Sequence, residues 1–390
     1  MPRDPTSSSR RQGGVKRLVL SGALAQRPDH GGHVWALLQW WLGLDGLGWD
    51  VLFVDRLGAG AVADPAAAVA RLVGELRPFG LEDALAVLGP QGEVLYGPPR
   101  AELVDHARTS VALFDVMGHL GDEELLGAVP RRVFVDIDPG FPQLWHELGL
   151  HDAFAGHDAF VTVGTAVGRP SSTVPTCGRR WVTTLPPVVL EQWPAAPVGG
   201  GDAWTSVVTW RGPFGPIEAH GRVYGLRAHE FRKLVALPAR TGRRFALALA
   251  IDPTDGADIA ALGREGWELL DPVETAGTAA AYQSFLRGSR AELLVAKHLY
   301  VATRGGWFSD RSACYLASGK PVVASDTGVV GLPAGEGFLT YSSSEEAAEA
   351  VLAVEADYPR HAAAARRLAA DHLDARTVLT DVLDRVGVSP

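Results

Sequence analysis

The sequence is poor in the residues on which disulfide frameworks, metal centres and membrane spans depend. Its 390 residues include only two cysteines, Cys177 and Cys314, and no Cys-x-x-Cys pair, so neither a disulfide framework nor a zinc site of that spacing is expected. No stretch approaches the roughly 18 uninterrupted apolar residues that a membrane-spanning helix needs. The motifs HExxH, GxSxG and GxxxxGK[ST] are also absent, so the chemistry of those sites is not expected.

Lysine is scarce as well, and the net charge is negative. Only four of the 36 basic residues are lysines, and the formal net charge is -9. An acidic chain is a poor match for nucleic acid or for an anionic membrane surface, so we expect no nucleic-acid partner and no membrane insertion. Residues 1–14 are polar, are expected to be a disordered tail and lack the apolar run of a signal peptide, so we expect a cytoplasmic protein.

The sequence does contain a regular alternation of short apolar runs with segments of helical length. Residues 15–22 read as a strand, 33–48 as a helix that is apolar on almost every face, and 49–55 as a second strand, which together form one β-α-β unit. Further continuous apolar runs, such as 110–116 and 131–138, are typical of buried parallel strands. The alternation predicts an α/β fold with doubly wound sheets.

A break in the alternation predicts two domains. Residues 15–190 are assigned to an N-terminal Rossmann-like domain and residues 205–365 to a C-terminal one, because residues 191–204 are rich in proline and glycine and read as a linker. Residues 366–390 are predicted to form helices that pack back toward the N-terminal domain. Two such sheets form a cleft, and ligands in open α/β sheets bind beyond the carboxyl ends of the strands.

The stretch 302–328, ATRGGWFSDRSACYLASGKPVVASDTG, carries the strongest local signal. Ser309 is placed to cap a helix that begins at Asp310, and the free amides of such a first turn attract anions. Arg311 lies in the same turn, and Lys297 ends the strand predicted over 291–296. These residues together predict a phosphate site.

The loop before this helix has the composition of a ligand contact. Gly305 and Gly306 would let the main chain approach a ligand closely. Trp307 and Phe308 could form the wall of a site for a sugar or a base.

The run AKHLYVATRGGWFSDRSACYLASGKPVVASDTG, followed by GLPAGEGFLTYSSSEEA, resembles the donor-binding half of bacterial glycosyltransferases of the GT-B fold, in particular family-four-like members. The resemblance implies two Rossmann-like domains facing across a cleft and metal-independent transfer of a sugar from a nucleotide-diphosphate sugar, with no other cofactor. It also implies a small-molecule or glycan acceptor bound to the N-terminal domain. Family-four enzymes carry two glutamates eight positions apart around this loop, whereas Gly306 and Cys314 stand at the matching positions here.

The resemblance directs the choice of donor-site residues. The predicted donor-binding residues are Arg211, Lys297, Gly306, Trp307, Phe308, Ser309, Asp310, Arg311, Gly31 and Gly32. Arg211 directly follows the strand predicted over 204–210, and Gly31 and Gly32 open the first helix, where they could face the phosphates across the cleft.

An acceptor hydroxyl needs a group that takes its proton if the reaction inverts. Three residues that follow strands or open the first helix are candidates for this catalytic base: Asp138, His119 and His33. Asp136 and Asp138 also resemble the metal-binding Asp-x-Asp motif of a different glycosyltransferase fold. That fold has one domain, whereas two are predicted here, so no metal is expected at this motif.

Two other functions fit the same architecture. One is an epimerase of nucleotide sugars, and the other is a catalytically silent protein that binds a nucleotide sugar. Incubation with labelled nucleotide sugars separates transfer, epimerisation and binding alone.

Overall fold

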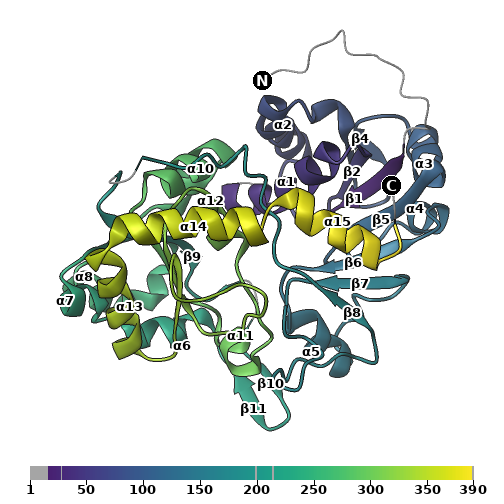
Figure 1. The fold of residues 1–390 in the computed structure, drawn as a ribbon. Helices are drawn as coiled ribbons and strands as arrows, with labels where there is room; N and C mark the ends of the chain where they lie inside the picture. The colour runs from purple at the N-terminus through teal and green to yellow at the C-terminus, as the bar shows by residue number, and fades with distance from the viewer. Residues whose placement is uncertain (1–15, 28, 198–199, 213–214, 389–390) are drawn as a thin grey trace.

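The computed structural model describes residues 16–388 apart from 28, 198–199 and 213–214 (Figure 1). The predicted disordered tail, 1–14, lies outside the described residues. Two α/β units lie side by side, each built around one sheet, and the last two helices run from one unit to the other along a common face (Figure 1).

The N-terminal sheet has eight strands in the order β4-β3-β2-β1-β5-β6-β7-β8, all parallel except β4, which is antiparallel to β3. The chain leaves β1 toward β2 on one side and later returns to β5 on the other, so the doubly wound switch point lies beside β1. The elements are β1 (Arg17–Ser21), α1 (Gly31–Gly46), β2 (Asp50–Arg56), α2 (Pro65–Leu76), β3 (Leu85–Leu88), β4 (Val94–Tyr96), α3 (Arg100–Thr109), β5 (Ser110–Val116), α4 (Glu123–Ala128), β6 (Arg132–Asp136), α5 (Phe141–Glu147), β7 (Ala159–Thr162) and β8 (Trp181–Thr183).

The C-terminal sheet has six parallel strands in the order β13-β12-β9-β14-β15-β16, with its switch point beside β9. The short hairpin β10–β11 stands apart from it. The elements are β9 (Ala203–Thr209), β10 (Ile217–Ala219), β11 (Arg222–Tyr224), α6 (Arg227–Phe231), α7 (Leu237–Thr241), β12 (Arg244–Ala250), α8 (Gly256–Arg264), β13 (Trp267–Leu270), α9 (Pro272–Ala276), α10 (Ala279–Gly288), β14 (Ala291–Leu294), α11 (His298–Thr303), α12 (Asp310–Ala317), β15 (Val322–Ser325), β16 (Phe338–Tyr341), α13 (Ser344–Ala356), α14 (Tyr358–His372) and α15 (Ala375–Arg385).

The amphipathic pattern of residues 227–241, RAHEFRKLVALPART, predicts one helix, but the structure divides it. These residues form α6, a 3₁₀ turn and then α7. Pro238 lies in the first turn of α7, where its missing amide costs no hydrogen bond, whereas inside a longer helix its ring would clash with the preceding turn. The hairpin β10–β11 was not foreseen in the sequence.

Helix α1 lies between the two units, and this position explains why its surface is apolar on almost every face. Trp35 on α1 donates from Nε1 to the main-chain oxygen of Ala279, at 2.8 Å, and its ring lies 4.8 Å from the ring of Trp193. Trp193 belongs to the segment 191–204 and is fully buried, so part of this proline-rich connection is packed. On another face of α1, Gly43 lets α15 approach, because a Cβ at Gly43 would lie 2.4 Å from Leu379.

None of the helices within the described residues is both long enough and apolar enough to cross a membrane.

Candidate active site

The carboxyl ends of the two sheets meet at an ion pair between Lys297 and Asp138. Lys297 follows β14 and Asp138 follows β6, and the Lys297 Nζ lies 2.9 Å from Oδ1 of Asp138. The ammonium also lies 4.5 Å from the ring centroid of Phe141 on α5. Burial lowers the pKa of Lys297, because the charged form loses its water, and Asp138 partly offsets this effect. The predicted donor residue Lys297 and the predicted base Asp138 are therefore in contact.

A second cation, Arg227, lies beside this pair. Arg227 is the first residue of α6 and is only 7% exposed. Its guanidinium donates to the main-chain oxygens of Val295, just after β14, and Thr209, at the end of β9, both at 3.0 Å. Burial, and to a smaller extent the charge of Arg311, lower its pKa to about 10, so Arg227 remains a cation at neutral pH.

Arg227 has no carboxylate hydrogen-bond partner among the described residues, and Asp138 is the one acidic group whose charge acts on it. Two cations, Lys297 and Arg227, therefore share one carboxylate at the ends of β9 and β14. A partly buried excess of positive charge is suited to a diphosphate. Sequence reasoning missed Arg227, because an arginine at the start of an amphipathic helix is usually exposed to solvent.

The space beside Lys297 is small in this structure. A cavity of about 10 Å³, room for about one water molecule, is lined by Lys297, Arg211 and Phe141 among others. Arg211 is half-exposed and its Nε donates to Asp255 at 2.9 Å. This space is too small for a diphosphate in the arrangement observed.

Arg311 is held inside the C-terminal domain rather than at this cavity. Its Nε donates to Glu292 on β14 at 2.6 Å, and its Nη1 donates to the main-chain oxygen of Val207 at 2.8 Å. The Glu292 side chain is fully buried. Ser309 caps α12 as predicted, with its Oγ accepting from the amide of Arg311, and burial raises the pKa of the neighbouring Asp310.

The loop that contains Gly306, Trp307 and Phe308 packs against protein. Trp307 is 8% exposed and stacks on Tyr300 with 4.4 Å between ring centroids, and Phe308 is 1% exposed and meets Phe338 edge-on. Gly306 has a φ of +76°, and a Cβ there would lie 2.6 Å from the amide nitrogen of Ala166 in the N-terminal domain. The glycine therefore permits a close approach of the other domain, and both aromatic rings fill protein interior.

Gly31 and Gly32 have a similar role at the other domain contact. A Cβ at Gly31 would lie 2.1 Å from the main-chain oxygen of Thr278, and one at Gly32 would lie 2.8 Å from the ring of Tyr282. The start of α1 is therefore seated on the segment that joins α9 to α10. This packing leaves no room for a phosphate beside Gly31 in the arrangement observed.

His33 and His119, the other predicted bases, lie in the N-terminal domain near the end of β1. The Nε2 of His33 lies 2.6 Å from the main-chain oxygen of Ala23, so this nitrogen carries the proton. Burial lowers the pKa of His33 to about 4, so the ring is neutral at pH 7 and its Nδ1 holds the lone pair. His119 is exposed and lies close enough for its charge to affect His33.

The low pKa of His33 predicts a loss of stability in acid. A histidine in the unfolded chain takes up a proton near pH 6.5, whereas His33 in the folded chain does so only near pH 4. The unfolded state therefore gains up to about 3 kcal/mol relative to the folded state as the pH falls from 6.5 to 4. Urea unfolding should show a smaller loss over this range in His33→Gln than in wild type or in the exposed control His151→Gln. Equal slopes in all three proteins would contradict the burial of His33.

Asp136 has a supporting role. Its carboxylate accepts from Gln143 Nε2 at 2.7 Å, from Thr162 Oγ1 at 2.8 Å and from the amide of Asp138 at 2.9 Å. Burial raises its pKa to about 6. Since Asp138 is paired with Lys297, neither carboxylate of this Asp-x-Asp is open to a metal in the observed arrangement. Within the described part of the chain, no group of three or more His, Cys, Asp or Glu side chains is placed to hold a metal ion.

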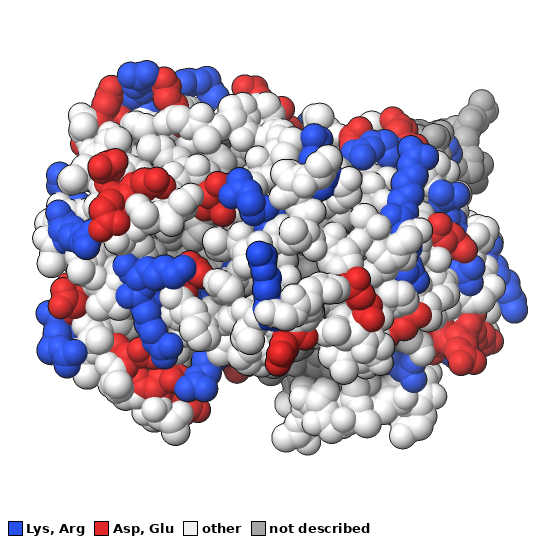
Figure 2. Space-filling model, turned by 90° about the horizontal axis from the view of Figure 1, so that it is seen from below, with Lys and Arg blue, Asp and Glu red and all other residues white. Residues whose placement is uncertain are grey.

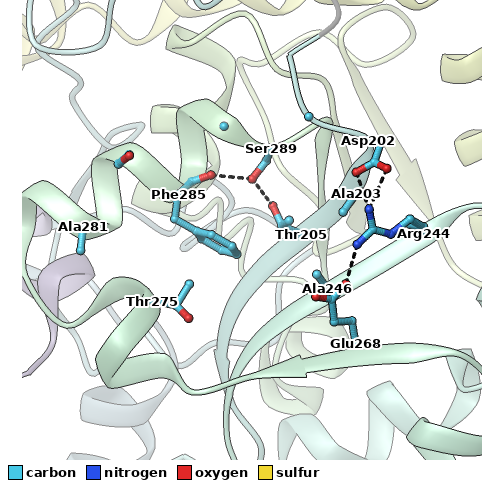
Figure 3. A pocket seen from close by; sticks show the side chains of 13 residues that line it. Asp202, Ala203, Thr205, Arg244, Ala246, Glu268, Thr275, Ala281, Phe285 and Ser289 are labelled. Carbon is cyan, nitrogen blue, oxygen red and sulfur yellow. Dashed lines mark hydrogen bonds and ion pairs between the residues drawn. The ribbon is translucent and has the colours of Figure 1, made fainter.

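A different hollow, of about 470 Å³, lies at the opposite edge of the C-terminal sheet (Figure 3). It opens at the amino ends of β9, β12 and β13, and Ser289 and Thr205 form a hydroxyl contact on its wall. Arg244 is bridged there by Asp202 and Glu268, so its charge is neutralised (Figure 3). Since ligands of open α/β sheets bind at the carboxyl ends, we assign the active site to the Lys297 edge.

Comparison with known proteins identifies the fold. No model of a known protein family matches the sequence, and no curated protein matches it. An alpha-glucosyltransferase in complex with UDP-glucose and DNA containing an abasic site is similar in structure, with a TM-score of 0.56, 12% identity and coverage of 96% of this chain and 100% of that chain. The chain has the GT-B fold. The predicted pair of Rossmann-like domains facing across a cleft is therefore confirmed.

Two further GT-B glycosyltransferases are similar over the same extent. Sucrose-phosphate synthase from Thermosynechococcus elongatus has a TM-score of 0.54 at 12% identity, and HepE from Anabaena in complex with UDP has 0.54 at 13%. Each covers 96% of this chain and 100% of its own. At such identities the likeness establishes the fold, and activity must be argued from the site.

The first of these similar structures contains DNA, so the surface charge of the present chain bears on whether it could bind nucleic acid. On the face drawn in Figure 2, the described basic and acidic side chains are interspersed and form no continuous basic surface. With a net charge of -9, the absence of a nucleic-acid partner stays a prediction.

Proposed function

We propose that this protein transfers a sugar from a nucleotide-diphosphate sugar to a hydroxyl or similar group of a small-molecule or glycan acceptor, without a metal ion. The observation that carries this proposal is the pair of cations, Lys297 and Arg227, at the carboxyl ends of β14 and β9, facing Asp138 of the other domain. The GT-B fold supports it, since this edge is where an open α/β sheet binds ligands.

In the proposed reaction, the acceptor oxygen forms a bond to the anomeric carbon while the bond from that carbon to the diphosphate breaks. The electron pair of the broken bond stays on the nucleoside diphosphate, and Lys297 and Arg227 stabilise the added negative charge. The acceptor proton passes to a base, and we assign this role to Asp138, because it is the candidate that contacts Lys297.

The contact between Lys297 and Asp138 suggests how the site is prepared. In the absence of donor, Asp138 neutralises Lys297 at 2.9 Å. When a diphosphate takes the place of Asp138 beside Lys297, the carboxylate is released toward the acceptor. One ion pair thus links the arrival of the donor to the availability of the base.

The nucleotide is proposed to be uridine diphosphate in the first instance, since several structures with the same fold contain UDP or UDP-glucose. Incubation with radiolabelled UDP-glucose and a panel of acceptors tests the proposed function. A labelled product larger than the donor supports transfer, conversion to a second UDP-hexose supports an epimerase, and binding without turnover supports a silent binding protein. Thermal-shift measurements with uridine, thymidine, guanosine and adenosine diphosphates select the nucleotide.

Lys297→Ala is expected to weaken nucleoside-diphosphate binding roughly 10- to 150-fold. This factor corresponds to the loss of one hydrogen bond to a charged group. Isothermal titration with the selected nucleotide measures this change. Lys233→Ala is the matched control, because Lys233 is exposed and pairs with Glu230, three residues before it in the sequence. Unchanged binding in Lys297→Ala would place the diphosphate elsewhere.

Removal of divalent metal is expected to leave transfer unaffected, because two protein cations supply the charge that a metal would supply. Activity measured after dialysis against EDTA should equal activity in added Mg²⁺ or Mn²⁺. A large loss that either ion restores would contradict the metal-independent part of the proposal.

A further inference from the structure

A second hollow lies in the N-terminal domain, at the carboxyl ends of β1, β2 and β5. Its volume is about 580 Å³, within the range of small-molecule sites. Its basic lining residues are Arg27, Arg56 and His119, and none of the described residues that line it is acidic. Burial lowers the pKa of His119, so the two arginines carry the positive charge. The pocket is therefore basic, although the whole chain is acidic.

Neither arginine of this pocket has its charge neutralised by a carboxylate of the described residues. Arg27 is exposed and makes no side-chain hydrogen bond or ion pair with the described residues. Arg56 donates to main-chain oxygens only, at 2.8 Å to Pro90 and also to Leu120 and Gly121. A carbonyl orients a guanidinium without cancelling its charge.

The carboxylates close to the pocket are engaged with other partners. Asp29, which lines a neighbouring hollow together with Arg27, pairs with Arg71, and Asp115, whose charge acts on His119, lies 3.3 Å from the Nε2 of His157. Asp122, whose pKa is affected by Arg56, forms an ion pair with Arg100 at 2.6 Å. Asp55 is fully buried, and its carboxylate accepts from the amides of Leu24 and Ala25. The hollow of Figure 3 differs, since its Arg244 is bridged by Asp202 and Glu268. Two arginines without carboxylate partners therefore line one pocket, and their guanidinium groups are free to bind an anion.

We propose that this pocket binds an oxyanion, a carboxylate or a phosphate, carried by the acceptor substrate. The inference rests on the proposed function, because it treats this pocket and the Lys297–Asp138 contact as two parts of one acceptor path. β5 and β6 are neighbours and Asp138 follows β6, so the strand spacing of about 4.8 Å puts the pocket roughly 5–15 Å from Asp138 along the sheet edge. An acidic sugar, a sugar phosphate or a hydroxylated aromatic acid spans that distance.

The test is a calorimetric titration of the full-length protein with inorganic phosphate and, separately, with acetate, both in saturating UDP. UDP occupies the donor site, so the remaining anion binding reports the second pocket. We expect Arg27→Gln to weaken this binding about tenfold or more and Arg27→Lys to weaken it less. Arg264→Gln, which removes an exposed arginine at the end of α8 in the other domain, should bind as wild type. Tighter binding of phosphate than of acetate, or the reverse, identifies which oxyanion the acceptor carries.

The two proposals fail in different ways. If none of the four nucleoside diphosphates binds, the proposed function is wrong, and titration of Lys297→Ala with phosphate still measures the second pocket alone. If UDP binds but neither anion does, or if Arg27→Gln and Arg264→Gln have the same effect, the anionic acceptor is refuted and the proposed function stands. Circular dichroism of each variant verifies folding, and Arg27→Lys preserves the charge if Arg27→Gln is unstable.

Discussion

Replacement of Asp138 by asparagine is expected to lower sugar transfer roughly 10²- to 10⁴-fold, the usual contribution of a positioned general base. Asparagine keeps the size of the side chain but cannot accept a proton at neutral pH. UDP affinity should stay the same or increase, because the neutral amide no longer competes with the diphosphate for Lys297. Steady-state kinetics together with calorimetry separate the two effects.

The opposite directions of these effects make the experiment specific. A side chain needed only for folding would lower both turnover and affinity. Asp152→Asn is the control, since Asp152 is exposed and pairs with His146 in the same domain. Turnover of Asp138→Asn close to that of wild type would return His119 and His33 to consideration as the base.

The second large effect concerns stability. Glu292→Gln is expected to lower the free energy of unfolding by roughly 3–5 kcal/mol, because it leaves Arg311 buried without a counter-charge. The Glu292 side chain is fully buried and lies 2.6 Å from Arg311. Urea unfolding measures the change.

An exposed pair in the same sheet is the control for this substitution. Glu268 on β13 pairs with Arg244 at 2.8 Å, and both side chains are about half exposed, so Glu268→Gln should cost at most about 1 kcal/mol. Replacing both Glu292 and Arg311 with apolar residues of similar volume should recover much of the loss. If Glu292→Gln is no more destabilising than Glu268→Gln, the pair is not buried as described.

Strands such as β5 and β9 were predictable because burial on both faces leaves a direct record in the sequence, whereas β3 (Leu85–Leu88), which is also buried, was not predicted. The apolar run 110–116 predicts a strand, and β5 occupies Ser110–Val116. The run 204–210 is likewise close to β9 (Ala203–Thr209). Each needs only its own residues to be recognised, since parallel strands covered by helices are continuously apolar. The hairpin β10–β11 is short and partly exposed, and it leaves no such record.

The site was less predictable because it depends on pairings between distant residues. Lys297 and Asp138 are 159 positions apart, and each was identified separately, but nothing in the sequence indicates that they touch. Arg311 looked like a phosphate ligand because nothing in the sequence indicates that Glu292, within the strand predicted over 291–296, is its buried partner. Arg227 was overlooked because the sequence around it suggests an exposed helix start, whereas the ends of β9 and β14, far away in the sequence, bury it.

The glycines illustrate a related limit. A glycine beside a predicted phosphate site indicates that another group approaches the main chain closely, but the sequence does not show whether that group is a ligand or another part of the protein. Here Gly31 is approached by Thr278 and Gly306 by Ala166, both across the domain junction. Their small size is therefore explained by contact between the domains in the arrangement observed.

The central claim is that a diphosphate binds between Lys297 and Arg227 at the carboxyl ends of β14 and β9. A crystal structure with UDP bound tests it most directly. We predict phosphate oxygens about 3 Å from the Lys297 ammonium and within reach of Arg227, with Asp138 no longer paired to Lys297. Phosphate density in the hollow of Figure 3, or UDP bound while the Lys297–Asp138 pair stays intact, would contradict it.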